Sequence, residues 1–227
     1  MKYAVIGTGK TGQTILDLLP QSDIVAVCNS RNPVTREKVK EADVGVVFVP
    51  GKAMGDLFPT LLNLELPLVI GTTGFAWPAD LDRQLKEMEV AWMLGQSFSL
   101  GLNVMRYYAE RVKKSLLALN PQTRIGITEK HHVHKLDAPS GTSIYIAHAL
   151  GVPKEEIASI REGDVKGTHS VSFDWPYDRV SLTHEAVDRR SFGEGALVAC
   201  ENMPRMKPGL HTFEKLADEL IENSLKG

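Results

Sequence analysis

The sequence predicts an α/β protein: a parallel sheet covered by helices in the first 98 residues, followed by a second domain of α+β character. Short apolar runs alternate with amphipathic segments up to residue 98, as they do where helices connect parallel strands. A glycine-rich turn joins the first apolar run to the first amphipathic segment. After residue 98 this alternation is replaced by one long helical stripe and then by segments with the period of strands.

Five strands are predicted in the first part, over residues 3–6, 24–27, 44–49, 66–71 and 90–94. The third is apolar throughout, which is typical of a parallel strand buried on both faces. Helices are predicted between them, over residues 11–20, 54–64 and 78–88. In the first helix Ile15, Leu16 and Leu19 have helical spacing, and Pro20 ends the segment.

The second part begins with a helix predicted over residues 102–119. Its apolar face carries Leu102, Met105, Ala109, Val112, Leu116 and Leu119. A strand at 124–129 precedes a histidine-rich loop and a helix at 142–150. Strands of a largely antiparallel or mixed sheet are predicted at 169–175, 179–187 and 196–200. A final helix over 211–225 is expected to pack back on the first domain, so the predicted domains are 1–98 with 190–227, and 99–189.

Composition excludes several classes of protein. The 227 residues include 26 Lys and Arg against 28 Asp and Glu, and this balance argues against a general binder of polyanions. Two cysteines, Cys28 and Cys200, cannot form a disulfide scaffold and suit a reducing compartment. No apolar run reaches the ~20 residues of a membrane helix or resembles the core of a signal peptide. A cytoplasmic location is therefore predicted.

The turn VIGTGKTG places Gly7, Gly9 and Gly12 in the spacing G-x-G-x-x-G. In dinucleotide-binding proteins the first glycine permits a tight turn, the second lets the backbone approach a pyrophosphate, and the third lets helix and strand pack closely. The helix that follows directs N–H groups at the anion. We therefore predict that the turn binds a cofactor, with a plain βα turn as the alternative. The predicted contacts also include Thr8, Lys10 and Thr11.

The end of the second strand bears on the choice between NAD and NADP. An acidic residue there binds the ribose 2′-hydroxyl of NAD, but this strand is followed by Asn29, Ser30 and Arg31. Asn29 or Ser30 can hydrogen-bond to the ribose, and Arg31 can pair with the 2′-phosphate of NADP. A solvated loop charge is the alternative role of Arg31. The predicted cofactor is NADPH or NADH, with NADPH slightly favoured.

The segment from Glu129 to Thr142, EKHHVHKLDAPSGT, contains three of the seven histidines within four residues. Histidine donates protons near neutral pH, and a lysine beside it binds or protonates an anionic group. The sequence PSGT then opens a helix, whose N-terminus offers free N–H groups, a hydroxyl and a positive dipole end. Together these residues predict a cradle for a small acidic substrate beside a proton source.

A metal site is the alternative interpretation of this segment, because Glu129 and the three histidines are all possible zinc ligands. Neighbouring residues of an extended chain point to opposite faces, however, and Lys130 and Lys135 would repel a cation. The segment also lacks a clear metal spacing such as H-E-x-x-H. We therefore predict no metal, and we expect at least one histidine, His134 in the first place, to serve packing alone.

The same residues resemble a known family. EKHHVHKLDAPSGTS is similar to the signature E-x-H-H-x-x-K-x-D-A-P-S-G-T-A of 4-hydroxy-tetrahydrodipicolinate reductase, also called dihydrodipicolinate reductase. Other segments that resemble the family lie in the expected order: GTGKTG, GTTGF at 71–75, SFSLG at 97–101, REGDVKGTHSVSF at 161–173 and THEAVDRRSFGEGA at 183–196. The resemblance covers nearly the whole chain.

The resemblance implies NADH- or NADPH-dependent reduction of 4-hydroxy-tetrahydrodipicolinate to tetrahydrodipicolinate with loss of water, a step of bacterial lysine and diaminopimelate biosynthesis. Hydride is expected at ring C4 and a proton at C3. The implied fold is a Rossmann-like cofactor domain with a substrate domain that also forms a homotetramer. The expected binding partner is thus a small dicarboxylate heterocycle, not nucleic acid or a membrane.

Carried over by motif position, the resemblance implies His131 as proton donor and acceptor, and Lys135 as a second catalytic proton donor. The implied substrate-binding residues are His132, Ser140, Gly141, Thr142 and Arg189. The implied contacts to the nicotinamide-ribose side of the cofactor are Gly71, Thr72, Thr73, Gly95, Gln96, Ser97 and Phe98. Domain closure is expected, with hinges near 98–101 and 189–193.

The sequence departs from the family pattern in three places. The acidic ribose-binding residue is absent, Ser97 replaces the asparagine of the usual A-x-N-F-S-x-G turn, and the turn at 48–50 reads FVP where D-F-T is usual. None of these departures touches the proton-transfer segment. The competing interpretations are another two-domain nicotinamide dehydrogenase acting on an amino acid or a semialdehyde, a catalytically silent nucleotide-binding or redox-sensing module, and a zinc protein.

Overall fold

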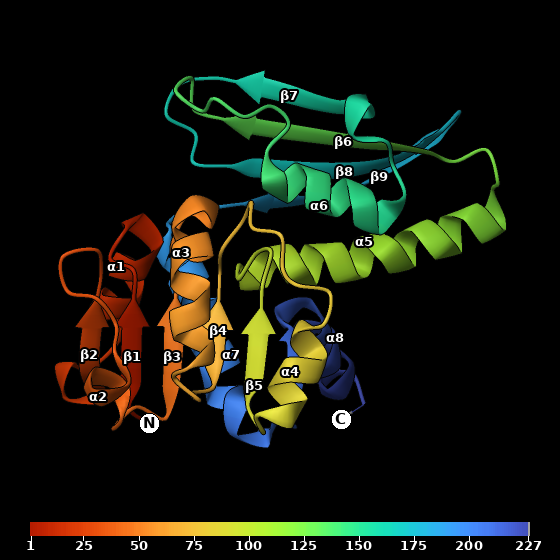
Figure 1. The fold of residues 1–227 in the computed structure, drawn as a ribbon. Coiled ribbons are helices and arrows are strands. Elements are labelled where there is room, and N and C mark those ends of the chain that lie inside the picture. Colours follow the sequence, from red (N-terminus) through yellow and green to blue (C-terminus); the bar gives the residue numbers. More distant parts are fainter. Residues whose placement is uncertain (227) are drawn as a thin grey trace. The chain divides into compact units, whose positions relative to one another are not determined.

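The computed structural model describes residues 1–226, and the chain divides into two compact units (Figure 1). Unit 1 contains Met1–Leu100 together with the C-terminal segment from Arg189, and unit 2 contains Gly101–Asp188. The chain therefore passes between the units twice, after Leu100 and after Asp188. Each unit has a sheet and a hydrophobic core of its own.

Unit 1 is built on a six-stranded parallel sheet in the order β10-β5-β4-β3-β1-β2. Its strands are β1 (Tyr3–Ile6), β2 (Ile24–Cys28), β3 (Val44–Val47), β4 (Leu68–Ile70), β5 (Ala91–Leu94) and β10 (Gly209–Thr212). The predicted parallel sheet is confirmed. The sixth strand was not predicted, because its sequence GLHT shows neither an apolar run nor an alternating pattern long enough to detect.

Helices cover both faces of this sheet, so its strands are apolar on both sides. Ile6, Val47 and Ile70 point into a core shared with α3 and α4. Their neighbours Val5, Val46 and Val69 point into a second core shared with α1, α7 and α8. The helices of unit 1 are α1 (Lys10–Leu18), α2 (Arg36–Val39), α3 (Gly51–Leu62), α4 (Leu81–Glu87), α7 (Arg190–Asn202) and α8 (Phe213–Ser224).

The strand predicted at 196–200 is wrong, because these residues belong to α7. Ala196, Ala199 and Cys200 are buried at helical spacing in the second core, whereas the short sequence ALVAC fits a strand equally well by composition. Gly193 and Gly195 explain the packing of this helix. A Cβ on Gly193 would lie 2.7 Å from Thr14 Oγ1 of α1, and one on Gly195 would lie 1.7 Å from the Phe98 carbonyl oxygen.

Unit 2 is a mixed four-stranded sheet in the order β7-β6-β8-β9, with α5 and α6 packed on one face. The strands are β6 (Arg124–His131), β7 (Ile157–Arg161), β8 (Thr168–Trp175) and β9 (Asp178–Glu185), and the helices are α5 (Leu100–Leu119) and α6 (Gly141–Leu150). Strand β7 runs parallel to β6, and the other pairs are antiparallel. Of these strands only β7 was not predicted from the sequence. Just one of its five residues is buried, so the segment lacks the apolar pattern of a core strand.

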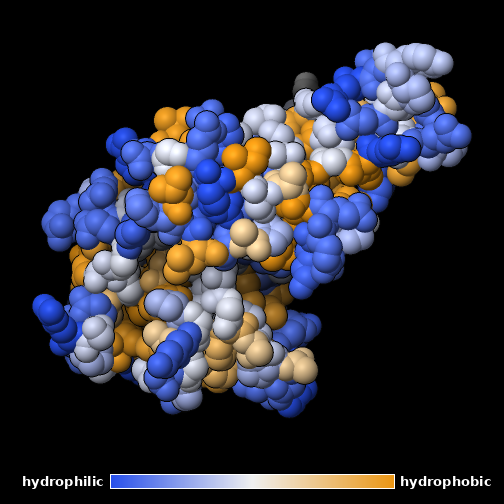
Figure 2. All heavy atoms as spheres, turned by 90° about the horizontal axis from the view of Figure 1, so that it is seen from above, coloured by the Kyte–Doolittle hydropathy of each residue, from blue (hydrophilic) through white to orange (hydrophobic). Residues whose placement is uncertain are grey.

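The described part of the chain also contains 3₁₀ turns over Gln21–Asp23, Lys154–Glu156 and Met203–Arg205. Within residues 1–226, no helix combines the length and the hydropathy that a membrane crossing requires. On the face shown in Figure 2, hydrophobic residues are interspersed with hydrophilic ones. Large exposed side chains such as Leu119, Leu136 and Tyr177 come from separate loops and helix ends.

Candidate active site

The glycine turn of unit 1 has the geometry that its spacing predicts. Gly7 follows β1 with a φ of 98°, and a Cβ there would lie 2.1 Å from the Phe48 carbonyl oxygen. A Cβ on Gly12 would lie 1.8 Å from the carbonyl oxygen of Gly7. Gly9 is the N-cap of α1, has no side-chain cap, and would present a Cβ to open space. The N-terminal N–H groups of α1 are thus accessible to an anion.

A hollow of about 610 Å³ adjoins this turn. It is lined by the turn, by the residues that follow β2, and by Phe48, Val49 and Pro50 after β3. The strand order reverses between β1 and β3, and such a switch point at the carboxyl ends of parallel strands is where α/β proteins bind nucleotides. Apolar walls beside an open helix N-terminus fit the adenosine and phosphate groups of a dinucleotide.

The residues after β2 have different tasks. The Asn29 side-chain carbonyl accepts hydrogen bonds from the backbone N–H groups of Arg31 and Asn32 at 2.9 and 3.0 Å, so it shapes the turn. Ser30 lines the hollow, and Arg31 is exposed. Cys28 also lines the hollow, but burial raises the pKa of its thiol, which makes it a poor nucleophile near neutral pH.

The predicted cofactor residues after β4 and β5 lie at the same edge of the sheet, because these strands are parallel to β1. Thr72 is buried, and its hydroxyl donates to the Val49 carbonyl oxygen at 2.9 Å. Phe98 is a core residue whose ring packs on Phe48 and Phe213, with centroids 5.6 and 4.8 Å apart. Ser97 is also buried. The exposed members of the set are Thr73 and Gln96.

In unit 2, the sheet face that packs on α5 and α6 changes from apolar to titratable along the strands. One row of paired residues across β6, β8 and β9 consists of Ile127, Val171 and Leu182. The next row on the same face consists of Glu129, His169 and His184. The rings of His169 and His184 are stacked, with centroids 6.2 Å apart, and the ring of His131 lies 5.2 Å from that of His169.

Glu129 is the centre of this cluster and is fully buried. Its Oε2 accepts hydrogen bonds from the Ser140 backbone N–H at 3.1 Å and the Ser143 hydroxyl at 2.9 Å. Its Oε1 accepts from Arg161 Nη2 at 2.9 Å. Burial opposes ionisation of this carboxyl, but the hydrogen bonds, led by those of Ser140 and Arg161, lower its pKa to about 2.

His131, the last residue of β6, places its Nδ1 3.3 Å from Glu129 Oε2. Burial lowers the pKa of His131, which the Glu129 carboxylate opposes and the cations Lys135 and Arg161 reinforce. The pKa of His169 falls to about 4, first through burial and then through repulsion by His131 and His184. The imidazole of His131 is therefore predominantly neutral near pH 7.

Lys135 lies in the loop that leaves β6, with its ammonium 2.8 Å from Asp137 Oδ1. Arg161 ties this loop to the sheet, since its Nε donates to the Lys135 carbonyl at 3.4 Å and its Nη2 to the Asp137 carbonyl at 2.5 Å. His132 is half-buried and His134 is exposed, with ring centroids 6.3 Å apart. Lys135 is near enough to His131 for its charge to help lower the pKa of that imidazole.

The predicted carboxylate cradle is the N-terminus of α6. Ser140 is its N-cap, and its hydroxyl accepts a hydrogen bond from the Ser143 N–H at 3.2 Å. Ser140 is buried, so its side chain serves the helix end, whereas Gly141 is exposed and Thr142 half-buried. A Cβ on Gly141 would meet nothing within 4 Å. Arg189, the remaining predicted contact, belongs to unit 1, where it is exposed directly before α7.

Ligand atoms of Glu129, His131 and His169 lie within 4.8 Å of one another, as they do in some metal sites. The carboxylate is already engaged, however. Its oxygens accept three hydrogen bonds, one of them from the guanidinium of Arg161 at 2.9 Å. A metal ion would have to displace these donors beside a fixed positive charge, so this donor set fits a cation poorly.

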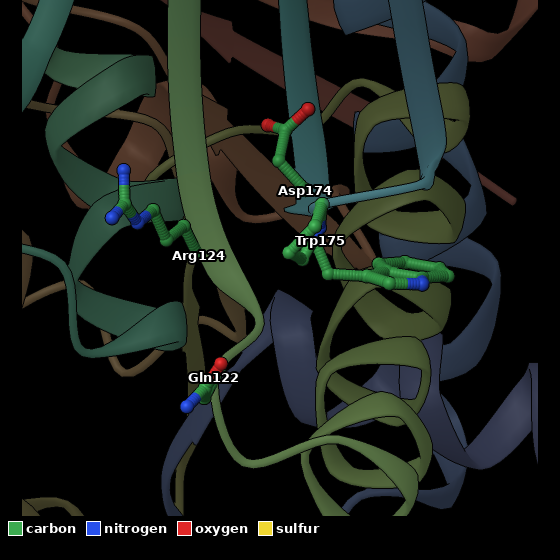
Figure 3. Close-up of a pocket in the computed structure, with 5 residues that line it drawn as sticks. Gln122, Arg124, Asp174 and Trp175 are labelled. Carbon is green, nitrogen blue, oxygen red and sulfur yellow. The ribbon is translucent and has the colours of Figure 1, made fainter.

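A second hollow of about 600 Å³ lies at the opposite end of β6, roughly 23 Å along the strand from His131. Its lining includes Gln122, Arg124, Asp174 and Trp175 (Figure 3). The labelled side chains diverge from one another, and Asp174 is paired with Arg179. This hollow offers no converging set of groups that would orient a substrate.

Sequence reasoning assigned no role to Arg161, Ser143 or His169, and it considered Glu129 only as a possible metal ligand. Arg161 and His169 lie within the segment REGDVKGTHSVSF, which marked the family resemblance. The alternation of β8 places His169 on the buried face with Val171, and a histidine at such a position was a usable signal. The pairing of His169 with Glu129 depends on strand register, which a single sequence does not reveal.

The comparisons with known proteins agree with the motifs. Residues 101–216 match the family described as "Dihydrodipicolinate reductase, C-terminus". The chain is 30% identical to a 4-hydroxy-tetrahydrodipicolinate reductase of Christiangramia forsetii, over 98% of this chain and all of that protein. It is 31% identical to one from Rickettsia bellii, over 96% of this chain and 95% of that protein.

Among solved structures, the chain is similar to a dipicolinate-bound dihydrodipicolinate reductase from Paenisporosarcina sp. TG-14, with a TM-score of 0.73 and 19% identity. The similarity covers 95% of this chain and 98% of that one, and it confirms the predicted fold class. The sequence relatives extend over both units and include the segment that carries His131 and Lys135. The chain belongs to the 4-hydroxy-tetrahydrodipicolinate reductase family.

Proposed function

We propose that the protein reduces 4-hydroxy-tetrahydrodipicolinate to tetrahydrodipicolinate with loss of water, using a nicotinamide cofactor, in lysine and diaminopimelate biosynthesis. The observation that carries the proposal is the arrangement around Glu129. One buried carboxylate contacts the N-terminus of α6 and lies beside His131, and through Arg161 it is linked to the loop of Lys135. A proton source thus lies beside an anion-binding helix end, in a chain with relatives named for this reaction.

The substrate of this reaction is a cyclic dicarboxylate, and each part of the site has a task. The exposed Gly141 and the half-buried Thr142 at the N-terminus of α6 bind one carboxylate through backbone N–H groups and a hydroxyl. His132 and Arg189 complete the binding of the substrate. Positioning of the ring is the main contribution of these groups, because a held geometry removes much of the entropic barrier.

When bound, the nicotinamide supplies a hydride to ring C4. This chain supplies the proton that C3 then needs, and it stabilises the charge that develops on the ring. His131 and Lys135 are the two candidates for this role. Because burial lowers the pKa of His131, donation of that proton is assigned to the ammonium of Lys135. His131 accepts or relays that proton, and each such group contributes ~10²–10⁴-fold in rate.

The cofactor is held by unit 1, through the glycine turn and the hollow beside it. We assign a preference for NADPH, because no carboxylate follows β2 while the exposed Arg31 is free to meet a 2′-phosphate. Unit 2 is assigned to substrate binding and to assembly of a homotetramer. Closure of the two units about the crossings after Leu100 and Asp188 brings cofactor and substrate together. The cytoplasm is the proposed location.

The test is an assay with freshly generated 4-hydroxy-tetrahydrodipicolinate, run with NADPH and with NADH. We expect nucleotide oxidation that depends on this substrate and is faster at low NADPH than at equal NADH. Aspartate semialdehyde serves as the control substrate, since a semialdehyde dehydrogenase is the main competing assignment. Turnover of the semialdehyde in place of the heterocycle would refute the proposal.

A further inference from the structure

One buried carboxylate connects the three parts of the candidate site in unit 2. Glu129 contacts the N-cap of α6 through the Ser140 N–H, lies 3.3 Å from His131 Nδ1, and accepts from Arg161. Arg161 in turn donates to the backbone carbonyls of Lys135 and Asp137. The N-terminus of α6, the imidazole of His131 and the loop that carries Lys135 are therefore all connected to the carboxylate of Glu129.

The position of Glu129 in the sheet makes a charged residue costly there. Ile127, two residues earlier on the same strand face, is packed in the hydrophobic core of unit 2. Glu129 itself has no solvent exposure, and an ionised group without water is stable only when hydrogen bonds replace its hydration. If folding were the only requirement, an apolar side chain at this position would give a more stable sheet face. The carboxylate therefore has a role beyond packing.

We propose that Glu129 is a positioning residue of the reaction: together with Arg161, its carboxylate fixes the His131 ring, the Lys135 loop and the N-terminus of α6 in one arrangement. The inference rests on the proposed function, because it names what orients the proton donors of that reaction. Glu129 itself does not touch the substrate. It acts through its contacts with Ser140 and Ser143 at the start of α6, with Arg161, and with the ring of His131.

The charge of Glu129 also sets the protonation of His131. The groups that face His131 are Glu129 on its own strand, Arg161 on β7, His169 on β8 and beyond it His184 on β9, with Lys135 and Asp137 in the following loop. The carboxylate nearest to Nδ1 is that of Glu129, and it opposes the effect of burial. Without its charge the pKa of His131 falls further, since the cations that remain repel a proton.

The test compares Glu129→Gln and Glu129→Asp with a matched control, Glu162→Gln. Glu162 pairs with Lys130 on the exposed side of the same strand pair, outside the site. Glutamine keeps the size of Glu129 and removes its charge, while aspartate keeps the charge and shortens the reach. The measurements are kcat and KM at saturating NADPH, the pH profile of kcat, dinucleotide affinity, and the His131 imidazole titration followed by NMR.

We expect Glu129→Gln to lower kcat by roughly 10- to 100-fold, because small displacements of reacting groups have effects of this size. KM should change less, and NADPH affinity should stay within twofold of wild type because unit 1 is untouched. The His131 titration and the corresponding limb of the pH profile should move to lower pH. Glu129→Asp should recover the titration and part of kcat, and Glu162→Gln should behave as wild type.

A wild-type kcat with an unmoved His131 titration in Glu129→Gln would overturn the proposal. A loss of kcat in Glu129→Gln without any change of the titration would also overturn it, since that result describes a structural residue. If Glu129→Gln does not fold, the Glu129→Asp variant decides, because its partial recovery requires the charge. The NMR titration needs no turnover, so an inactive wild-type protein would refute the proposed function while leaving the placement of His131 by Glu129 open to measurement.

Discussion

The glycine turn of unit 1 depends on backbone geometry and on the lack of a side chain at its glycines, whereas the cluster around Glu129 in unit 2 is formed by buried titratable side chains. At Gly7 and Gly12 the neighbouring carbonyl oxygens occupy the places where a Cβ would stand. Around Glu129, by contrast, every carboxylate oxygen has a donor. Local sterics therefore determine the first site, and strand register determines the second. The two sites should respond differently to mutation and to pH.

The largest difference between the two units is expected when the residues proposed for proton transfer are substituted. Lys135→Ala and His131→Gln should each lower kcat by roughly 10²- to 10⁴-fold, because the first removes the proposed donor of the ring C3 proton and the second removes its acceptor or relay. NADPH affinity should not change, since both residues belong to unit 2. Steady-state kinetics and dinucleotide binding by fluorescence measure the two effects. A wild-type kcat in either variant would remove that residue from the mechanism.

Acid should weaken unit 2 before unit 1. The pKa of His169 is lowered from 6.5 to about 4 and that of Glu129 from 4.5 to about 2. Both groups bind protons more readily in the unfolded chain, so the stability they provide is complete above pH 6.5. It is lost as the pH falls, first between 6.5 and 4 and then between 4.5 and 2. Protonation of either group in the folded state therefore lowers the stability of unit 2.

Amide hydrogen exchange at decreasing pH, corrected for the intrinsic pH dependence, measures this loss strand by strand. We expect protection of β6 and β8 to fall below pH 6 while β1 and β3 of unit 1 stay protected. The variant His169→Gln is the control, because it removes the largest contribution to the first transition and leaves the smaller ones of His131 and His184, whose pKa values are also lowered by burial. Simultaneous loss of protection in both units would contradict the assignment of the acid transition to the Glu129 cluster.

Substitution of two glycines in the same turn should distinguish an effect on folding from an effect on cofactor binding. In Gly12→Ala the new Cβ would lie 1.8 Å from a carbonyl oxygen, so we expect a loss of stability of about 1–3 kcal/mol or more. In Gly9→Ala the Cβ meets nothing within 4 Å, so folding should be unchanged. If the pyrophosphate approaches Gly9, NADPH affinity should nevertheless fall about tenfold. Thermal unfolding and dinucleotide binding distinguish the two results.

The two units also differ in what the sequence alone could reveal. The glycine turn and the buried strands of unit 1 are local patterns, and they were predictable within a few residues. In unit 2 the residue types from Glu129 to Thr142 were enough to predict a site for proton transfer and anion binding. The role of Glu129 was not predictable, because Arg161 and His169 are brought to it only by the pairing of β7 and β8 with β6. The helix α7 was mistaken for a strand because ALVAC satisfies both patterns.

The smallest expected effect concerns Arg31 and tests the choice of nucleotide. Asn29 is committed to the turn after β2 by its two backbone hydrogen bonds, so it is not the counterpart of the ribose-binding carboxylate. That leaves Ser30, which lines the hollow, and the exposed Arg31. Arg31→Ala should raise KM for NADPH about tenfold, the equivalent of one charge-assisted contact, and leave KM for NADH unchanged. Equal changes for both nucleotides would show that Arg31 acts on the turn itself, and no change for either would make it a solvated loop charge.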